Sequence, residues 1–500
     1  MTFESAPPAD LAGDVPPPTP PRLQARVVKS FAWSAASLGG SRLMVFVSTV
    51  VLARLLAPRE FGVVAVGITL TTYLEMALDL GVGSSIVYEQ ERGVTPRVQT
   101  AFTLNLLVAG FLTVVGFLAA PAVSRFFDVG GEVTLLRTIF LYFLFRGAGQ
   151  VQDAVLKRDL EFKKRAIADV VSAAIRMAIS IVLALAGYGA WSIVWGLLAG
   201  ALTSTAIKWA QVRFRPQFRL DRAASTTLLR FGLTVTALKV LSTVGEDFDY
   251  VVVGHQLGPT QLGLYTMAYR LPELLVSSFF WIFSHVAFAA YSNARAEGSD
   301  MFRTAMLRAL RFTTLFGFTV GTGLALVARD AIPVLFSDRW TAAVSPMVLI
   351  SLAVGLASVG YASGDIFSAA GRPGLLLKLN GPLAIARVAG FVVAAQHGIV
   401  AVAAVHLAFS AVYPILRLAV ANHIVDATFR DDLRAMRPGL SAAAGIVACA
   451  LPVRLLTDTG ASSLALICMT GTLGAIAGLA LGAPSTFGEV RELVRLGRTG

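Results

Sequence analysis

Long apolar runs, separated by short polar segments, dominate this chain from residue 31 onwards. A helix needs about 20 mainly apolar residues to cross the hydrocarbon core of a bilayer. Fourteen runs approach this length, at residues 31–53, 61–86, 100–121, 134–155, 167–186, 190–209, 231–253, 262–288, 312–328, 342–369, 376–395, 399–416, 439–456 and 462–482. Strands of alternating hydrophobicity do not appear. Because a helix satisfies its own backbone hydrogen bonds within lipid, the pattern predicts an all-α polytopic membrane protein of about 14 transmembrane helices.

The composition agrees with a chain that uses the bilayer as its solvent. Only 14% of its 500 residues are charged and 56% are hydrophobic, whereas a soluble domain is nearer a quarter charged. The net charge of +12 would also suit a nucleic-acid-binding protein. Basic cytoplasmic loops explain this excess better in a membrane protein, so we expect the bilayer and no nucleic acid as a partner.

The distribution of Lys and Arg orients the predicted spans. With the N-terminus placed in the cytoplasm, the inside segments hold 29 of the 42 basic residues and the outside segments hold 6. Since cytoplasmic loops carry such an excess, an even number of spans leaves both termini inside. Residues 1–29 are polar and Pro-rich, without the basic-then-apolar order of a signal peptide, and predict a disordered cytoplasmic tail.

One turn occurs twice along the chain. The first two predicted spans are joined by LLAPREFG, residues 55–62, and the seventh and eighth by QLGPTQLG, residues 256–263. Pro and Gly break helices and shape tight connections between them. Six spans separate the copies, so the copies have the same orientation. The sequence therefore predicts a parallel repeat about an axis along the membrane normal.

Several segments carry a family resemblance. They are WSAASLGGSRLMVFVSTVVLARLLAPREFGVVAVG and LDLGVGSSIVYEQE in the first two spans, RDLEFKKRA after the fourth, GYGAWSIVWG entering the sixth, and FDYVVVGHQLGPTQLGLYTMAYRLPEL in the seventh and eighth. With these segments, residues 25 to 420 resemble the polysaccharide flippases. These are the lipopolysaccharide and O-antigen transporters of the multidrug/oligosaccharidyl-lipid/polysaccharide exporter superfamily.

The resemblance implies an architecture and a substrate. Two six-helix lobes would form a V around a central cavity and rock to open it to either side of the bacterial inner membrane. The N-lobe would be residues 30–210 and the C-lobe residues 231–420, joined by a basic linker, 211–230. Residues 421–500, with two further spans, lie outside the duplication. The implied substrate is an oligosaccharide on a polyprenyl diphosphate, carried by a monomer that serves the polysaccharide polymerase or export machinery.

Three cations within the predicted spans are candidates for the substrate site. An ionised side chain at the centre of a membrane helix costs on the order of 2.5–3.5 kcal/mol, so such residues usually face a partner or a polar cavity. Arg42, Lys239 and Arg387 would supply a cationic cavity for a diphosphate, because basic side chains bind phosphate oxygens. For Arg42, an ion pair with a neighbouring carboxylate is an equal alternative.

Carboxylates of the second and seventh spans are candidates for coupling to Na⁺ or H⁺. Glu75 and Asp79 are four residues apart and share one helix face, where they could hold a cation or neutralise Arg42. The seventh span contributes Glu246, Asp247 and Asp249, although these could instead touch water at a helix end. Only Asp249 matches the acidic residue of the family's turn motif.

Other charged or polar residues within the spans suit local structure. Arg270 and Glu273 are three residues apart and can pair on one helix face, and Arg176 could lie near a helix end or snorkel. A lone histidine such as His406 is more often packed and hydrogen-bonded than a ligand. The sequence has no phosphate-binding loop and no His/Cys metal spacing, so we expect no resident cofactor and no built-in ATP hydrolysis.

Other functions stay open at this point. A cation-coupled antiporter for drugs or organic cations would need an acidic or aromatic cavity with few cations. A glycan polymerase or acyltransferase usually needs a large external loop, whereas the longest external loops here are about 10 to 15 residues. A non-transporting membrane subunit of a polysaccharide assembly complex is a further alternative. A cationic cavity would favour the flippase.

Overall fold

The computed structural model describes residues 20–79, 96–218 and 220–489, and within these ranges the chain is helical apart from its connections. The helices are α1 (Pro20–Leu55), α2 (Pro58–Asp79), α4 (Pro96–Phe126), α5 (Val133–Phe140), α6 (Tyr142–Arg158), α7 (Phe162–Leu185), α8 (Ala190–Gln211), α9 (Arg222–Pro272), α10 (Ser278–Glu297), α11 (Ser299–Leu335), α12 (Val344–Ala369), α13 (Pro373–Ala395), α14 (Ile399–Val425), α15 (Phe429–Leu456) and α16 (Ala461–Gly482). A π-helical turn, η1 (Glu273–Ser277), precedes α10, and a 3₁₀ turn, η2 (Asp338–Ala343), precedes α12.

The predicted all-α class is confirmed, and each of the fourteen predicted spans falls on helix wherever it is described. Ten helices of the described ranges are long and apolar enough to cross a membrane. Two spans differ in detail. The fourth is divided at Leu141 into α5 and α6, and the seventh and eighth form the long α9, which continues into η1 and α10. Gly258 interrupts α9 with φ 80° and ψ 176°, a conformation that favours glycine, so the chain turns there.

The two repeated turns pack against each other. A Cβ atom on Gly62 would lie 1.6 Å from the carbonyl oxygen of Pro259, and one on Gly263 would lie 2.0 Å from that of Pro58. Each glycine is therefore needed for the close approach of the other copy's backbone. Reciprocal contact of equivalent residues is what a two-fold axis between two copies produces. We call the end of the molecule where these turns meet the turn end.

A second reciprocal contact lies at the turn end. Arg54 donates hydrogen bonds to the carbonyl oxygens of Leu335 (3.0 Å) and Val334 (2.6 Å), at the last turn of α11. Its equivalent in the repeat, His255, holds Nδ1 2.6 Å from the carbonyl oxygen of Phe126, at the end of α4. Each basic side chain thus binds the C-terminal carbonyls of a helix from the other copy, where cations are favoured.

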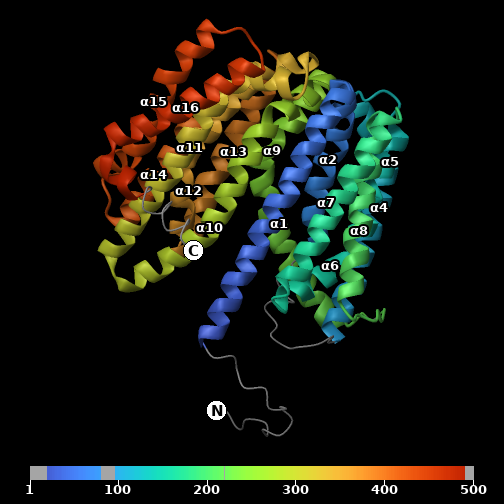
Figure 1. The fold of residues 1–500 in the computed structure, drawn as a ribbon. Helices are drawn as coiled ribbons and strands as arrows, with labels where there is room; N and C mark the ends of the chain where they lie inside the picture. Colours follow the sequence, from blue (N-terminus) through green and yellow to red (C-terminus); the bar gives the residue numbers. More distant parts are fainter. Residues whose placement is uncertain (1–19, 80–95, 219, 490–500) are drawn as a thin grey trace, which may run out of the picture.

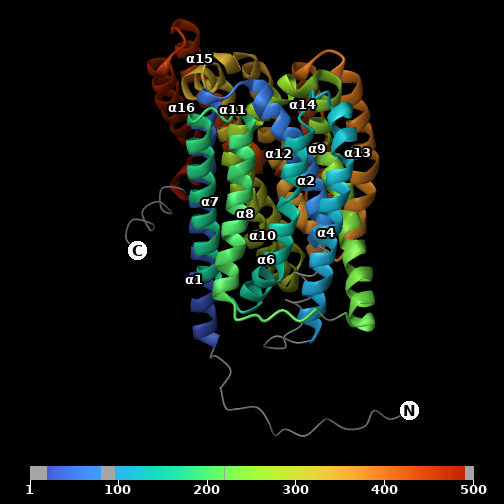
Figure 2. The ribbon, with the colours of Figure 1, turned by 90° about the vertical axis from the view of Figure 1, so that its right-hand side faces the viewer.

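The last two helices, α15 and α16, pack closely against each other at one side of the bundle (Figures 1 and 2). A Cβ atom on Gly445 would lie 2.0 Å from the carbonyl oxygen of Gly474, so α15 and α16 approach at backbone distance. Small residues allow this packing between membrane helices. On α15, Gly439 makes a similar approach to Thr314 of α11. Exposed leucines such as Leu473 cover the outside of the pair, as expected for a surface that faces lipid.

Candidate functional site

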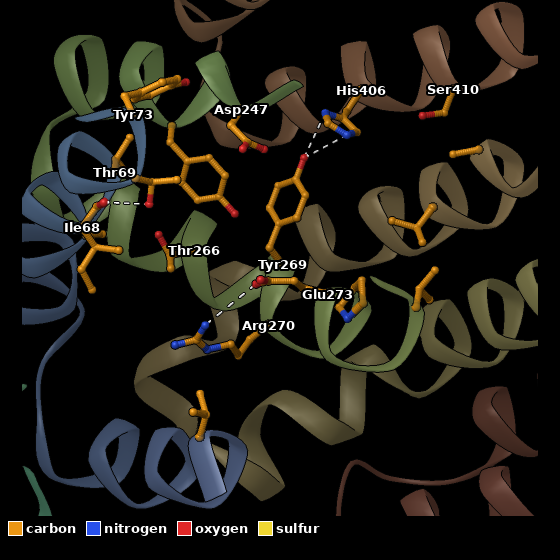
Figure 3. A pocket seen from close by; sticks show the side chains of 18 of the residues that line it. Ile68, Thr69, Tyr73, Asp247, Thr266, Tyr269, Arg270, Glu273, His406 and Ser410 are labelled. Atoms are coloured by element: carbon orange, nitrogen blue, oxygen red, sulfur yellow. Dashed lines mark hydrogen bonds and ion pairs between the residues drawn. The ribbon is translucent and has the colours of Figure 1, made fainter. Parts of the chain in front are cut away.

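A cavity of about 750 Å³ lies between the two copies of the repeat. Its walls come from α1, α2, α7 and α8 on one side, and from α9, η1, α12, α13 and α14 on the other. Figure 3 shows side chains of both sides pointing into it, with Thr69 and Tyr73 facing Asp247 and Tyr269. Helices of both copies therefore shape one polar space within the membrane-spanning bundle.

The charged residues that line the cavity are mostly basic. The arginines are Arg176, Arg270, Arg387 and Arg417, and the carboxylates are Asp247 and Glu273. In a site walled by low-dielectric helices, fixed charges act more strongly than in water. The excess of guanidinium groups over carboxylates therefore makes the described lining attractive to an anion, and the arginines can bind phosphate oxygens in bidentate fashion.

Arg42 reaches this site through an ion pair. Its Nη1 lies 3.8 Å from Oε1 of Glu273, and Arg270 places its own Nη1 3.9 Å from the other carboxylate oxygen (Figure 3 draws the Arg270 pair). The side chains of Arg42, Glu273 and Arg270 are 39%, 45% and 31% exposed, so solvent screens both pairs. The paired alternative for Arg42 is therefore what the structure shows. The expected local pair of Arg270 and Glu273 also forms, but inside the cavity wall.

Asp249 lies directly behind the cavity wall, in a hydrogen-bonded network. The residue is 1% exposed, and its Oδ2 accepts hydrogen bonds from the hydroxyls of Tyr265 (2.7 Å) and Tyr269 (3.1 Å). The backbone N–H of Tyr250 donates to its Oδ1. His406 Nδ1 lies 3.7 Å from the same carboxylate. Three donors around one buried carboxylate satisfy it without a metal ion.

The network continues into the cavity. The Tyr269 hydroxyl lies 2.9 Å from Nδ1 of His406, and an Arg387 nitrogen lies 3.0 Å from the same ring (Figure 3 shows the tyrosine contact). Tyr269, His406 and Arg387 all line the cavity. A polar chain therefore connects the buried carboxylate on α9 with α13, α14 and the central space. Asp247, two residues before Asp249, lines the cavity directly.

The remaining candidates lie elsewhere or outside the described residues. Glu75 pairs with Arg146, with 2.9 Å between its Oε1 and the arginine Nε, so it does not neutralise Arg42. It also lies outside the cavity lining. The side chains of Asp79, Lys239 and Glu246 are outside the described part of the chain.

The structure adds two arginines to the cavity that the sequence analysis placed elsewhere. Arg176 was expected to lie near a helix end or to snorkel, and Arg417 was counted among the basic residues of a cytoplasmic segment; both line the cavity. Among the described residues, neither side chain makes a hydrogen bond or an ion pair, although the Arg417 guanidinium lies 5.3 Å above the ring of Tyr413. The buried Nε of Arg417 has no acceptor there.

A buried ion cluster lies in the first copy, between α6, α7 and α8. Lys208 on α8 places its ammonium 2.9 Å from Asp153 of α6, and the two side chains are 3% and 5% exposed. Arg165 (2.9 Å) and Lys157 (2.7 Å) bind the same carboxylate. Neither Lys208 nor Asp153 lines the cavity. This cluster joins three helices at the end of the bundle opposite the turn end and is structural in character.

Comparisons with known proteins agree with this architecture. A family model described as "Polysaccharide biosynthesis protein" matches residues 51–345. The succinoglycan biosynthesis transport protein ExoT of Rhizobium meliloti is 27% identical over 340 residues, which is 67% of this chain and 68% of that protein. The lipopolysaccharide biosynthesis protein WzxC of Escherichia coli is 22% identical over 72% of this chain and 73% of its own.

Two solved structures are similar in fold. The lipid II flippase MurJ, in an inward closed conformation, superposes with a TM-score of 0.74 at 15% identity, covering 92% of this chain and 99% of its own. An outward-facing multidrug resistance transporter of the MATE family, from the MOP superfamily, gives a TM-score of 0.56 at 16% identity, covering 80% and 95%. At these identities, the likeness concerns the fold alone.

Proposed function

We propose, from the premise that this chain belongs to the polysaccharide biosynthesis protein family, that it flips a lipid-linked oligosaccharide across the membrane. The substrate would be an oligosaccharide on a polyprenyl diphosphate, destined for a surface polysaccharide. It would leave the cytoplasmic leaflet and enter the outer leaflet of the inner membrane. The chain would do this as a monomer with both termini in the cytoplasm, and would deliver its cargo to the polymerase or export machinery.

The observation that carries this proposal is the cationic cavity shared by both copies. A diphosphate is the charged element that every polyprenyl-diphosphate-linked sugar has in common. Arg270, Arg387 and Arg417 come from three different helices and converge on one space, where a dianion could meet more than one guanidinium. A cavity built for organic cations would carry the opposite excess of charge.

The sugar portion has suitable partners in the same space. Tyr250, Tyr269, Tyr361 and Tyr413 line the cavity together with several threonines and serines. Aromatic faces pack on the apolar faces of sugar rings, and hydroxyl groups exchange hydrogen bonds with sugar hydroxyls. The polyprenyl chain is as apolar as the lipid tails, so it would remain in the bilayer while the head group occupies the cavity.

The turn end supplies the closed gate of an alternating-access cycle. Backbone contacts at Gly62 and Gly263, with the reciprocal hydrogen bonds of Arg54 and His255, join the two copies there. An apolar core shared by both copies lies beside these contacts: Phe61 packs edge-on against Trp340, whose indole donates to the carbonyl oxygen of Ala53. Rocking the copies about this region would break the hydrogen bonds, at about 0.5–1.5 kcal/mol each, expose part of that core, and open the cavity toward the outside.

We assign the coupling of transport to an ion gradient to a series of hydrogen-bonded side chains. The series runs from Asp249 through Tyr269 and His406 to Arg387. Its carboxylate already accepts three hydrogen bonds, which favours a proton over Na⁺ as the coupled ion, because Na⁺ would have to displace those donors. Movement of α14 against α9 would change the distance from His406 to Asp249, and so the proton affinity of the pair. Asp247 would act at the cavity surface.

Deletion of the gene tests the proposed function. Without the protein, the lipid-linked glycan should accumulate in the cytoplasmic leaflet, where a glycan-modifying enzyme reaches it in inverted vesicles but not in spheroplasts. Complementation with the parent should restore access from outside, and Arg270→Gln should restore it at least tenfold less well, because one charge-assisted contact is lost. Arg339→Gln is the control, since Arg339 is exposed and does not line the cavity.

Two results would count against the flippase. Accumulation of the glycan in the outer leaflet would place the missing step after translocation, as for a polymerase subunit. Normal surface glycan together with a new sensitivity to organic cations would instead indicate an antiporter. In either case the cationic lining would need another explanation.

A further inference from the structure

A second cavity lies in the C-terminal copy, at the end of the bundle opposite the turn end. It measures about 360 Å³ and is lined by Arg295, Gly298, Ser299, Phe302, Ala370, Arg372, His423 and Ile424. Because α11 ends at the turn end, where its last carbonyls bind Arg54, its first residues must lie at the other end. The cavity therefore lies near the membrane surface and apart from the central site. We call it the basic pocket.

Basic side chains of three separate connections meet in the basic pocket. Arg295 lies in the last turn of α10, Arg372 immediately precedes α13, and His423 lies in the last turn of α14. The nearest carboxylates in sequence, Glu297 and Asp426, are absent from the described lining. A concave site with three basic side chains and no lining carboxylate attracts an anion.

The donors of these side chains are only partly used within the protein. Arg295 donates through Nη1 to the carbonyl oxygen of Ala369, at the end of α12, which leaves its other N–H groups available. The Arg372 side chain makes no hydrogen bond or ion pair with any residue that the structure describes. Both arginines and His423 are exposed, so a ligand can reach them without a rearrangement of the fold.

The surroundings point to a membrane lipid as the source of the anion. The neighbouring start of α15 carries Arg430, Arg434 and Arg437 at helical spacing beside the exposed Phe429 and Leu433. A helix face with basic and large apolar residues side by side is typical of the interface with anionic headgroups.

An ion pair joins this face to the wall of the basic pocket. Arg303 of α11 binds Asp431 of α15 at 2.5 Å, and it directly follows Phe302, a lining residue. Phe302 and Ile424 give the pocket an apolar wall beside its cations. This combination suits the phosphate and glycerol region of a lipid better than a fully hydrated ion.

We propose that the basic pocket binds the phosphate of an anionic phospholipid headgroup at the cytoplasmic face. Such a ligand would join the ends of α10, α12 and α14 through one phosphate. The same chemistry could be satisfied by a free phosphate, so the test must separate the two sources. This assignment does not depend on what the central cavity transports.

Lipid binding to the purified full chain tests the proposal. Short-chain phosphatidylglycerol should bind the parent at least tenfold more tightly than short-chain phosphatidylcholine, and Arg372→Gln combined with His423→Gln should abolish the difference, because two donors to the phosphate are lost. Arg295 is left unchanged because it also binds the end of α12. Arg339→Gln, an exposed arginine of η2 near the turn end, should retain the parent's preference.

Three outcomes would overturn the assignment. The first is an equal preference for phosphatidylglycerol in the parent and the double variant. The second is displacement of the lipid by inorganic phosphate in excess, but not by sodium chloride of the same ionic strength, which would identify a soluble phosphate as the ligand. If the double variant does not fold, Arg372→Gln alone serves, since the Arg372 side chain has no partner among the described residues. An unchanged preference in that variant is the third outcome.

Discussion

The two copies of the repeat surround an equivalent basic residue differently. Lys208 on α8 and Arg417 on α14 each stand eighteen residues after the first residue of their helix, and both helices follow a glycine with positive φ. In the first copy the cation is buried against Asp153 at 2.9 Å. In the second copy, the Arg417 guanidinium lies against Gly364 and lines the cavity, without an ion pair among the described residues.

The difference shows how one architecture yields a cation bound within the fold and a cation that lines the central cavity. A buried cation needs a partner, and removal of that partner leaves an uncompensated charge at high cost. Lys208 has its carboxylate partner and holds α6 and α8 together. In the other copy, the glycine beside Arg417 carries no side chain, which leaves room for the guanidinium at the central space.

Removal of the carboxylate in the first copy should have the largest effect. Asp153→Asn leaves Lys208, Arg165 and Lys157 around a neutral amide, and we expect a loss of about 3 kcal/mol or more of unfolding free energy. Thermal unfolding of the purified protein measures it. Asp169→Asn is the control, because Asp169 is 3.8 Å from Lys208 and more exposed, and should change stability little. Equal effects of the two variants would contradict a structural role for the cluster.

Removal of the two equivalent cations should separate stability from transport. Arg417→Gln should reduce glycan translocation at least tenfold with an unchanged melting temperature, because its charge serves the substrate and not the fold. Lys208→Gln should instead lower the melting temperature, since Asp153 loses its most buried partner. Surface glycan per folded molecule and thermal unfolding are measured together. A destabilised Arg417→Gln with normal translocation per folded molecule would reverse the assignment.

A carboxylate can be added beside Arg417 in the second copy, to imitate the ion pair of the first copy. Gly364→Asp places a carboxylate beside Arg417, whose Nη2 lies 2.4 Å from the position of a Cβ atom and belongs to a flexible side chain. We expect a several-fold loss of translocation, because the neutralised arginine binds the diphosphate less well. Gly364→Ala keeps the added volume without the charge and should retain more activity. If both variants lose translocation equally, space and not charge is decisive.

The sequence was sufficient for the helices and for the repeat, because both depend on local patterns. Apolar length fixes a membrane helix, and the Pro and Gly of the turns around Pro58 and Pro259 are visible directly. The division at Leu141 was not predicted, since no Pro or Gly marks it. The reciprocal contact of the turns depends on how the two copies are placed in space, which no local pattern contains.

The site was only partly predictable, since the face that a helix presents is set by its neighbours. Arg387 lies in the cavity as proposed, but Asp249 lies behind its wall and Glu75 pairs elsewhere. Arg417 was missed because the predicted span ended at residue 416, whereas α14 continues to Val425. Its match to Lys208, at the same distance from a glycine in the other copy, was the signal that could have revealed it.

The smallest expected effect concerns the turn end, where the two copies behave alike. Arg54→Gln or His255→Gln removes one of the two equivalent contacts to a helix C-terminus. Each loss should weaken closure by about 0.5–1.5 kcal/mol, which corresponds to a few-fold increase in open molecules, and the double variant should show the two effects added. Labelling of Thr69→Cys from outside, with Cys449 and Cys468 replaced by serine, reports the open state, because Thr69 lines the cavity.

The control for this experiment lies on the same turn. The Arg59 side chain is exposed and makes no hydrogen bond with the residues that the structure describes, so Arg59→Gln changes the charge of the turn end without removing a hydrogen bond between the copies. Its labelling rate should equal that of the parent. If it rose as much as in Arg54→Gln, net charge at the turn end would control opening. If none of the variants changed the rate, the reciprocal hydrogen bonds would contribute nothing to closure. The backbone contacts at Gly62 and Gly263 and the apolar core around Trp340 would then hold the gate.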